Sequence, residues 1–318
     1  MVGLMKEGWR KLGWQGVRAR IPSDWEIGAI SGDHKSGYLR LDDHVMPRLE
    51  LKWASHRGKP DLNNLLDEYF KGLRKEYGKK GAQIRIKRGI SLVKDTSGFQ
   101  NKDLIFFSWK SAKVRAFGMI WFCADCRRTL IAQMNGFSGE NIRSRAIDIF
   151  TSIEDHPTGP SNLWTAYGLE VKVPRRYRLE KHKMMSAYLL LSFADGSRRI
   201  AIERYGLADT LLRSISLEEW FRRTYAKDMK GYGFQIYPVS ADGIHEEISL
   251  EGHKLRFIDR IPLSILGVLD LIVRRRRMSA RIWRCRESNR IFVVRSVAKV
   301  DTSKIVQDIA SSIRCHEG

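Results

Sequence analysis

The four cysteines are the residues of this chain with the most specific chemistry. Cys123 and Cys126 form a Cys-x-x-Cys pair, whereas Cys285 and Cys315 stand apart from it. The Cys-x-x-Cys spacing places two thiolates on one turn, as tetrahedral zinc sites require. Four cysteines in 318 residues do not resemble the dense disulfide framework of a small secreted domain. The spacing therefore favours metal binding or plain burial of the thiols over disulfide bonds.

Zinc ligands of two further types follow this pair in the sequence. A carboxylate and an imidazole end the helical segment that comes next. Zinc prefers four such groups in a tetrahedron, about 2.0 to 2.3 Å from the ion. No cofactor is expected beyond a candidate structural zinc ion, which would tie the last hairpin of the first half to the helix that follows, through Cys123, Cys126, Asp155 and His156. Because a lone Cys-x-x-Cys is a weak signal, burial of these side chains without a metal is the preferred interpretation.

A partial copy of the same set lies in the second half of the chain. It lacks the second cysteine of the turn, so a metal there requires a water molecule or a substitute ligand. Alternatively, Cys285 and Cys315 form a buried thiol pair. The matched positions, in chain order, are Cys285, Ser288, Cys315 and His316.

Other features of the two halves also match, which indicates an internal duplication. Pro22 lies thirty-one residues before Trp53, and Pro174 lies thirty-one residues before Tyr205. A helical segment follows each of these aromatic residues, and another closes each half. We expect a first α+β repeat over residues 1–156, a Pro/Gly linker over 157–163 and a second repeat over 164–318.

Hydrophobic periodicity predicts the elements of each repeat. Apolar residues recur at helical spacing in two segments of the first half, residues 62–77 and 142–153. Alternating or apolar runs predict strands near residues 17–21, 38–41, 48–53, 83–88, 104–109, 114–122 and 128–134. Strands that follow one another without a helix between each pair form antiparallel sheets. The fold class is therefore α+β, with two tandem copies of a domain in which helices cover an antiparallel sheet.

The pattern resembles the tandem use of a Mog1/PsbP-like fold, an αβα sandwich. The segments IPSDW (21–25) and VPRRY (173–177) resemble the P-x-x-W motif with which that fold starts a strand. The closing helices AIDIFTSIEDH and IVQDIASSIRCH resemble its final helix. That family includes a binder of a small GTPase and extrinsic subunits of a photosynthetic membrane complex. The resemblance implies a non-enzymatic role in binding or assembly, and it carries over no functional residue.

The formal charge of +21 predicts an anionic partner. Because the excess is shared almost equally between the two halves, it belongs to folded surfaces and not to a basic tail. We expect phosphate contacts to nucleic acid or a ribonucleoprotein particle, without base readout. Solubility or thermal adaptation is the alternative. The candidate residues are Lys71, Arg74, Lys75, Lys79, Lys80, Arg85, Lys87, Arg175, Arg176, Arg178, Arg274, Arg275, Arg276 and Arg277.

An apolar and basic insertion distinguishes the second repeat, at about residues 257–277. It is too short to span a bilayer. A second hypothesis therefore makes the protein an adaptor that docks on a protein partner or an anionic membrane surface through this insertion. Packing of the insertion on its own domain is the alternative. The docking residues would be Ile261, Leu263, Leu266, Leu269 and Ile272.

Catalytic patterns are weak throughout the sequence. Asp42 or Asp43, with Glu50 and Lys52 after them, imitates the metal-binding hairpin of some nucleases, but the second repeat loses the pattern. The commonest nucleotide-binding and hydrolase motifs are absent. The N-terminal segment also lacks the continuous apolar stretch of a signal peptide or a membrane anchor. We therefore expect a cytoplasmic protein that is not an enzyme.

Overall fold

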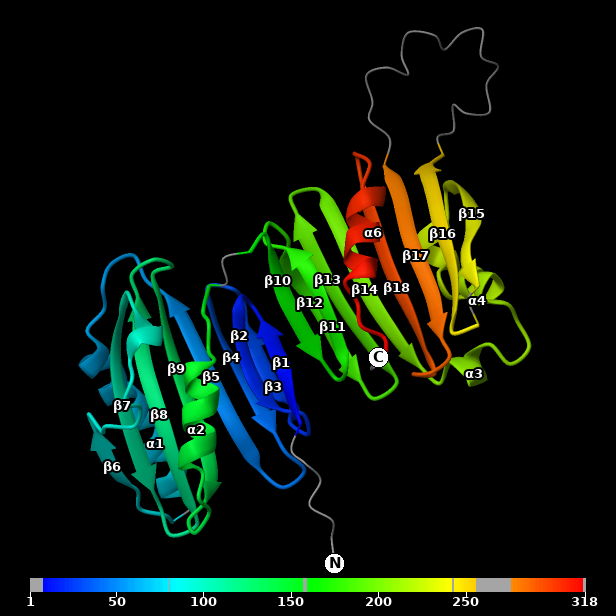
Figure 1. The fold of residues 1–318 in the computed structure, drawn as a ribbon. Coiled ribbons are helices and arrows are strands. Elements are labelled where there is room, and N and C mark those ends of the chain that lie inside the picture. Colours follow the sequence, from blue (N-terminus) through cyan, green and yellow to red (C-terminus); the bar gives the residue numbers. More distant parts are fainter. Residues whose placement is uncertain (1–7, 80, 157–158, 242, 256–275, 317–318) are drawn as a thin grey trace, which may run out of the picture. The chain divides into compact units, whose positions relative to one another are not determined.

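The computed structural model describes residues 8–79, 81–156, 159–241, 243–255 and 276–316 (Figure 1). Contacts divide the chain into two compact units, residues 1–168 and 169–318. The division falls in the turn between strands β10 (Ser161–Ala166) and β11 (Leu169–Pro174). Of the predicted linker, residues 157–158 lie outside the described residues, and β10 already begins within its last part.

The first repeat consists of a two-stranded hairpin, a seven-stranded antiparallel sheet and two main helices. The sheet has the strand order β3-β4-β5-β9-β8-β7-β6. Its elements are β1 (Trp9–Trp14), β2 (Val17–Pro22), β3 (Glu26–Gly32), β4 (Ser36–Asp42), β5 (Pro47–Ser55), α1 (Leu62–Lys79), β6 (Arg85–Arg88), the 3-10 helix η1 (Ser97–Phe99), β7 (Lys102–Lys110), β8 (Val114–Cys123), β9 (Arg128–Phe137) and α2 (Arg143–Thr151).

The second repeat has the same order of elements, which confirms the duplication. Its hairpin is β10–β11, and its sheet has the order β12-β13-β14-β18-β17-β16-β15. The remaining elements are β12 (Arg178–Met185), β13 (Tyr188–Asp195), β14 (Arg198–Gly206), α3 (Ala208–Leu211), α4 (Leu217–Thr224), α5 (Ala226–Met229), β15 (Tyr232–Ala241), β16 (His245–Lys254), β17 (Arg277–Cys285), β18 (Arg290–Ala298) and α6 (Ser303–Ser311).

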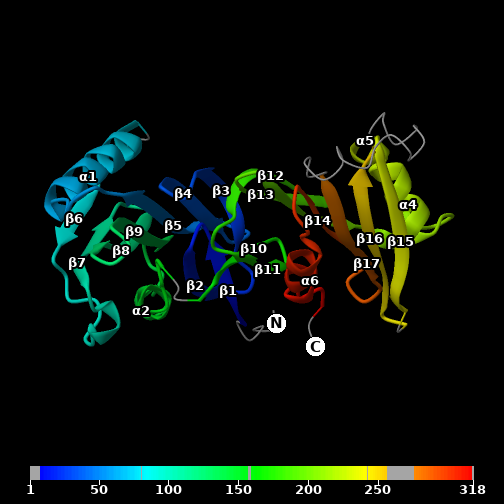
Figure 2. The ribbon, with the colours of Figure 1, turned by 90° about the horizontal axis from the view of Figure 1, so that it is seen from above.

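Helices cover both faces of each sheet (Figure 2). In the first repeat, β8 is apolar at successive positions because both of its faces are buried. Ile120 and Phe122 belong to the core under α1. On the opposite face, the guanidinium of Arg143 in α2 lies 5.9 Å from the centre of the Phe117 ring, within the distance of about 6 Å that is typical of cation–π contacts. In the second repeat, α4 and α6 take the places of α1 and α2.

One serine hydrogen bond ties the closing helix to the hairpin in both repeats. The hydroxyl of Ser152, just after α2, accepts a hydrogen bond of 2.9 Å from the N–H of Arg20 in β2. The hydroxyl of Ser312, just after α6, accepts one of 3.0 Å from the N–H of Lys172 in β11. The hairpin and the closing helix therefore form one layer on that face of the sheet.

The predicted match of Trp53 with Tyr205 is wrong by one residue. Arg128 and Arg290 are equivalent, since each lies five residues after the shared cysteine. Arg128 pairs with Ser55 of β5, two residues after Trp53, whereas Arg290 pairs with Gly206 of β14, only one residue after Tyr205. Because successive strand residues point to opposite faces, a shift of one residue exchanges the faces. The indole N–H of Trp53 accordingly donates to Asp33 on the hairpin side, whereas the Tyr205 ring lies edge-on to Trp220 of α4.

The predicted helices 62–77 and 142–153 correspond to α1 and α2, and each predicted strand overlaps an observed one. Strands β1 and β3 were not predicted. The sequence of β3, EIGAISG, has two glycines, and most of its residues are exposed or half-buried at the sheet edge. A strand that buries so little gives no alternating apolar signal.

A buried ion pair lies under α4 in the second repeat. Glu203 is almost fully buried, and its carboxylate accepts hydrogen bonds from Arg295 (2.9 Å), Tyr188 (2.6 Å) and Tyr205 (3.0 Å). Burial and the nearby negative charge of Glu203 raise the pKa of Tyr205 to about 12, so this hydroxyl stays protonated and can donate. A buried charge of this kind is tolerated because each of its oxygens has a donor.

Replacing Phe70 of α1 with alanine should destabilise the first repeat by about 3–5 kcal/mol, because a buried ring leaves a cavity. Phe70 is fully buried, and its ring centre lies 5.1 Å from that of Phe107. Hydrogen exchange of the β7 and β8 amides measures the loss within that repeat. The control Lys71→Ala removes an exposed side chain on the same helix and should change stability by less than about 0.5 kcal/mol. Equal effects of the two changes would contradict the core assignment.

Arg295→Met should destabilise the second repeat by about 3–5 kcal/mol, since it leaves the Glu203 carboxylate buried without its cation. The double variant Arg295→Met/Glu203→Gln should recover part of this loss. Arg281→Met serves as the control, because its partner Glu247 is partly exposed, and about 0–1 kcal/mol is expected. Hydrogen exchange of the β14 and β18 amides distinguishes these outcomes, and a double variant no more stable than Arg295→Met would contradict the argument.

Candidate functional site

The structure brings together the four side chains that the sequence suggested as zinc ligands in the first repeat. Cys123 ends β8, Cys126 lies in the turn that leads to β9, and Asp155 and His156 follow α2. One ligand atom from each of the four lies within 4.8 Å of the others. The turn between two strands and the end of the closing helix therefore meet at one point.

The contacts within this first cluster are close. The Cys123 sulfur lies 3.5 Å from His156 Nδ1, and the Cys126 sulfur lies 3.5 Å from Asp155 Oδ2. Asp155 is buried and also accepts a hydrogen bond of 3.0 Å from the indole N–H of Trp121. Lys102, at the start of β7, places its Nζ 3.5 Å from Asp155 Oδ1.

Burial and neighbouring negative charge both oppose ionisation of the Cys126 thiol in the first cluster. Burial, followed by the charges of Asp155 and Cys123, raises the pKa of the Cys126 thiol to about 12. Burial also works against ionisation of Asp155, but the nearby Lys102 ammonium and the Trp121 N–H outweigh it and lower the pKa of that carboxyl. A cation between the two thiols and the carboxylate would relieve this repulsion.

A second cluster occupies the matching place in the second repeat. Cys285 ends β17, whereas Cys315 and His316 follow α6. His245, the first residue of β16, completes the set, and one ligand atom from each of the four lies within 4.8 Å of the others. Sulfur-to-nitrogen distances are 3.2 Å from Cys315 to His245 Nε2, 3.3 Å from Cys285 to His316 Nδ1 and 3.2 Å from Cys315 to His316 Nδ1.

His245 was missed by the sequence reasoning, which expected this repeat to lack a fourth side-chain ligand. It lies far from Cys285 along the chain and has no match among the first-repeat candidates. The two residues are opposite one another in the β16–β17 pairing, however. Cross-strand register is the signal that would have found His245. The thiols of Cys285 and Cys315 are close together, as suggested, but two imidazoles accompany them.

The two thiols of the second cluster differ in acidity. Burial opposes ionisation of Cys285, but Ser288 and His316 against its sulfur outweigh burial and lower the pKa to about 7. Burial, followed by the charge of Cys285, raises the pKa of Cys315 to about 11. One thiol of the pair is therefore ready to ionise, while the other needs a further positive group.

Basic candidates of the first repeat gather on α1 and the neighbouring edge strand β6. We call this group the α1–β6 surface, and an ion pair between Arg88 of β6 and Asp67 of α1 joins its two elements. Within the described part of the chain, one member has an acidic partner, since Lys71 lies 4.0 Å from Glu68. The exposed members are Lys71, Arg74, Lys75, Lys79, Arg85 and Lys87. The candidate Lys80 lies outside the described residues.

Basic candidates of the second repeat lie on and just before β12, the edge strand of its sheet. Arg175, Arg176 and Arg178 are exposed, as are Lys181 and Lys183. We call these five residues the β12 surface. Arg176 has an acidic partner, Asp195, at 3.2 Å. Their position on an edge strand leaves them accessible to a large partner.

Tyr77 and Tyr177, two tyrosines interleaved with these basic residues in the sequence, are not exposed. Tyr177 is buried in the core. Tyr77 is half-buried, with its ring centre 4.9 Å from that of Trp109. Neither ring is available as a platform for bases, so the basic surfaces offer charge without exposed aromatic stacking from these residues.

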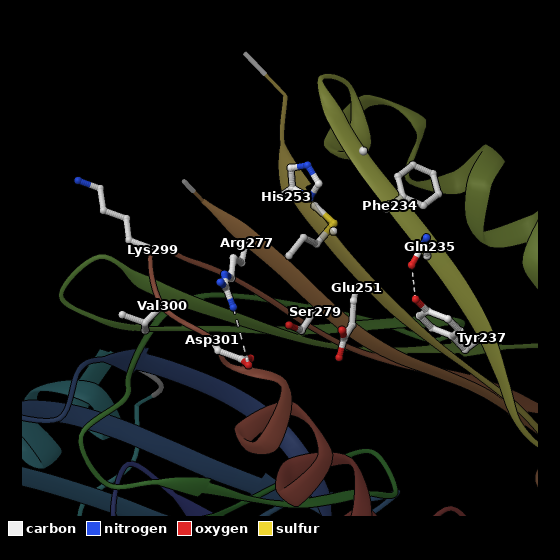
Figure 3. A pocket seen from close by; sticks show the side chains of 13 residues that line it. Phe234, Gln235, Tyr237, Glu251, His253, Arg277, Ser279, Lys299, Val300 and Asp301 are labelled. Carbon is white, nitrogen blue, oxygen red and sulfur yellow. Dashed lines mark hydrogen bonds and ion pairs between the residues drawn. The ribbon is translucent and has the colours of Figure 1, made fainter. Parts of the chain in front are cut away.

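A hollow of about 1070 Å³ lies beside β15, β16 and β17 and the segment leading into α6 (Figure 3). Arg277 and Lys299 line it together with the carboxylates Glu251 and Asp301. Arg277 lies 4.0 Å from Asp301, so part of its charge is already balanced. The hollow therefore has mixed charge and does not select anions by itself.

The nuclease-like residues are engaged in structural contacts. Asp42 forms an ion pair of 2.7 Å with Arg40, and Asp43 forms one of 2.6 Å with the buried Arg48. Glu50 accepts hydrogen bonds from Tyr38 and Asn135. Among the described residues, these carboxylates form no group able to hold a metal ion. All three carboxylates are therefore held by contacts within the first repeat.

Most of the 257–277 insertion lies outside the described residues, which stop at residue 255 and resume at 276. The docking candidates Ile261, Leu263, Leu266, Leu269 and Ile272 lie there, as do Arg274 and Arg275. Arg276 is exposed, and Arg277 begins β17. The insertion connects β16 to β17, where the first repeat has only the short turn 111–113 between β7 and β8.

No protein-family model matches this chain, and no curated protein matches it either. Among the described residues, no helix has the length and apolar character needed to cross a membrane.

Proposed function

We propose that this protein is a non-enzymatic binding protein that holds a polyanion, either nucleic acid or a ribonucleoprotein particle, by phosphate contacts. The observation that carries the proposal is the placement of exposed basic side chains on one accessible edge of each repeat, the α1–β6 surface and the β12 surface. Each surface belongs to a folded element whose backbone is held by the sheet or the helix. The charges are therefore presented in fixed positions.

The amount of charge supports a polyanionic partner. A net charge of +21 produces a long-range attractive field, and contacts to phosphates release counterions into solution. Within the described part of the chain, most side chains of the two surfaces have no acidic partner, so their positive charges are available to bind an external anion. Binding without base readout also agrees with the burial of Tyr177 and the packing of Tyr77.

The fold-level resemblance supports the non-enzymatic part of the proposal. We assign each repeat to the Mog1/PsbP-like type on its P-x-x-W-like segment, its closing helix and its helix-covered antiparallel sheet. A role in binding or assembly is what this resemblance implies. The internal contacts of Asp42, Asp43 and Glu50 agree with the same role.

Affinity for a fluorescently labelled duplex oligonucleotide should fall steeply with salt. The slope of log K against log salt is expected near −0.9 for each phosphate neutralised. Fluorescence anisotropy over a series of KCl concentrations measures this slope, with single-stranded DNA and RNA of equal length as parallel probes. Absent binding at low salt, or binding insensitive to salt, would refute the proposal.

Charge reversal on the α1–β6 surface should weaken oligonucleotide binding more than the same change of net charge elsewhere on the protein. Arg85→Glu/Lys87→Glu removes two exposed cations of β6 and should weaken oligonucleotide binding by about tenfold or more. The matched control Lys227→Glu/Lys304→Glu makes the same change of net charge at exposed positions outside both surfaces. If both double variants bind equally well, the α1–β6 surface is not the contact.

A further inference from the structure

We infer that each repeat holds one zinc ion at the same place in the fold, and that the two sites use different sets of four ligands. This inference goes beyond polyanion binding and stands apart from it. In the first repeat the ligands are Cys123, Cys126, Asp155 and His156; in the second they are His245, Cys285, Cys315 and His316.

The spacing of the ligand atoms suits a single small ion. In a tetrahedron with zinc–sulfur bonds of about 2.3 Å and zinc–nitrogen bonds of about 2.0–2.1 Å, sulfur and nitrogen are about 3.5 Å apart. The sulfur-to-nitrogen distances are 3.5 Å in the first repeat and 3.2 to 3.3 Å in the second. The contact between Cys126 and Asp155 is also 3.5 Å. These distances in the first repeat therefore match a tetrahedral site, and those in the second need to lengthen by only about 0.2 to 0.3 Å.

Two ligand positions are shared by the repeats and two are exchanged. Cys123 and Cys285 end equivalent strands, and His156 and His316 follow equivalent helices. The second repeat loses the second cysteine of the turn, where Ser288 stands, but gains His245. His245 occupies the position that Lys102 has in the first repeat, because His245 pairs with Cys285 and Lys102 pairs with Cys123.

The second exchange changes the ligand that precedes the histidine. Asp155 in the first repeat corresponds to Cys315 in the second, since each comes directly before the histidine of its set. From the first repeat to the second, the turn position loses its ligand, because Ser288 replaces Cys126. The strand position gains one, because His245 replaces Lys102. The position before the histidine keeps a ligand but changes its type, from Asp155 to Cys315. The number of ligands remains four in both repeats. Packing alone does not require this conservation of number, whereas a tetrahedral ion does.

The charges of the two sites also balance. Two thiolates and one carboxylate exceed the charge of a zinc ion by one unit, and Lys102 supplies the missing positive charge 3.5 Å from Asp155. In the second repeat two thiolates match the zinc ion, and the lysine position holds the neutral imidazole of His245. Counting the four ligands of each site, together with Lys102 in the first, both partly buried sites are therefore neutral with zinc bound, which avoids the cost of burying net charge.

An outer carboxylate lies beside the shared histidine in each repeat. Nδ1 of His156 faces Cys123, and its Nε2 lies 3.7 Å from Asp125 in the β8–β9 turn. His316 faces Cys285 in the same way, with Nε2 3.7 Å from Glu287 in the β17–β18 turn. A histidine that binds a metal through one nitrogen commonly directs the other to a carboxylate. Four protein ligands leave no open position, so the ions are structural.

Zinc content of the purified full chain tests the inference. Elemental analysis after dialysis against a mild chelator should give about two zinc ions per chain, falling to about one in Cys123→Ser and to about one in Cys285→Ser. Cobalt substitution of the wild type provides a second measurement that does not depend on the folding of a variant, because tetrahedral cobalt–thiolate sites have a characteristic absorption. Absence of zinc together with absence of this absorption would overturn the inference.

A rescue experiment tests the exchange of ligands in the second repeat. His245→Ala should lower the zinc content to about one, and His245→Ala/Ser288→Cys should restore about two by recreating the Cys-x-x-Cys turn. Ser288→Ala is the matched control, and it should retain two. A zinc content that is unchanged by His245→Ala, or not restored by the added cysteine, would refute the ligand assignment. Oligonucleotide binding is measured separately, so failure of either proposal leaves the other intact.

Discussion

Burial of the central strands on both faces is the constraint on which the structure of each repeat depends. In β8 the residues from Ala116 to Cys123 are all buried, and at Gly118 the ring of Phe107 fills the space that a side chain would take. A strand of this kind is stable only if separate layers cover its two faces. Helix α1 or its counterpart α4 supplies one layer, and the hairpin with the closing helix supplies the other. Because the second layer has two parts, contacts that join those parts are required.

The ends of the closing helices are where these contacts concentrate. Ser152 and Ser312 bond the hairpin backbone, and the next residues along the chain carry the ligand clusters. Each cluster joins the turn between two central strands to the chain beyond the closing helix. Zinc at these points would hold the second layer to the sheet by bonds much stronger than the packing of a short helix. The proposed ions thus act where the second layer meets the sheet.

The two repeats have diverged most where the shared fold does not constrain them. The buried polar group under the covering helix differs between them. Under α1, Gln133 accepts hydrogen bonds from Tyr69 and Trp109, whereas under α4, Arg295 pairs with Glu203. The exposed basic residues also lie on different elements, α1 and β6 in one repeat and β12 in the other. A folded core tolerates such changes as long as each buried polar group keeps a partner.

Local patterns in the sequence determined the duplication, the α+β class, both helices of the first repeat and most of its strands, because apolar periodicity and spacing reflect burial directly. They also identified the four candidate ligands of the first repeat, which stand in two short segments.

Tertiary structure alone decided three further points. It placed Trp53 and Tyr205 on opposite faces, since a shift of one residue in strand register leaves little trace in the sequence. It revealed β3, whose residues bury too little to show a pattern. It brought His245 to Cys285, because only the pairing of neighbouring strands joins residues so far apart along the chain.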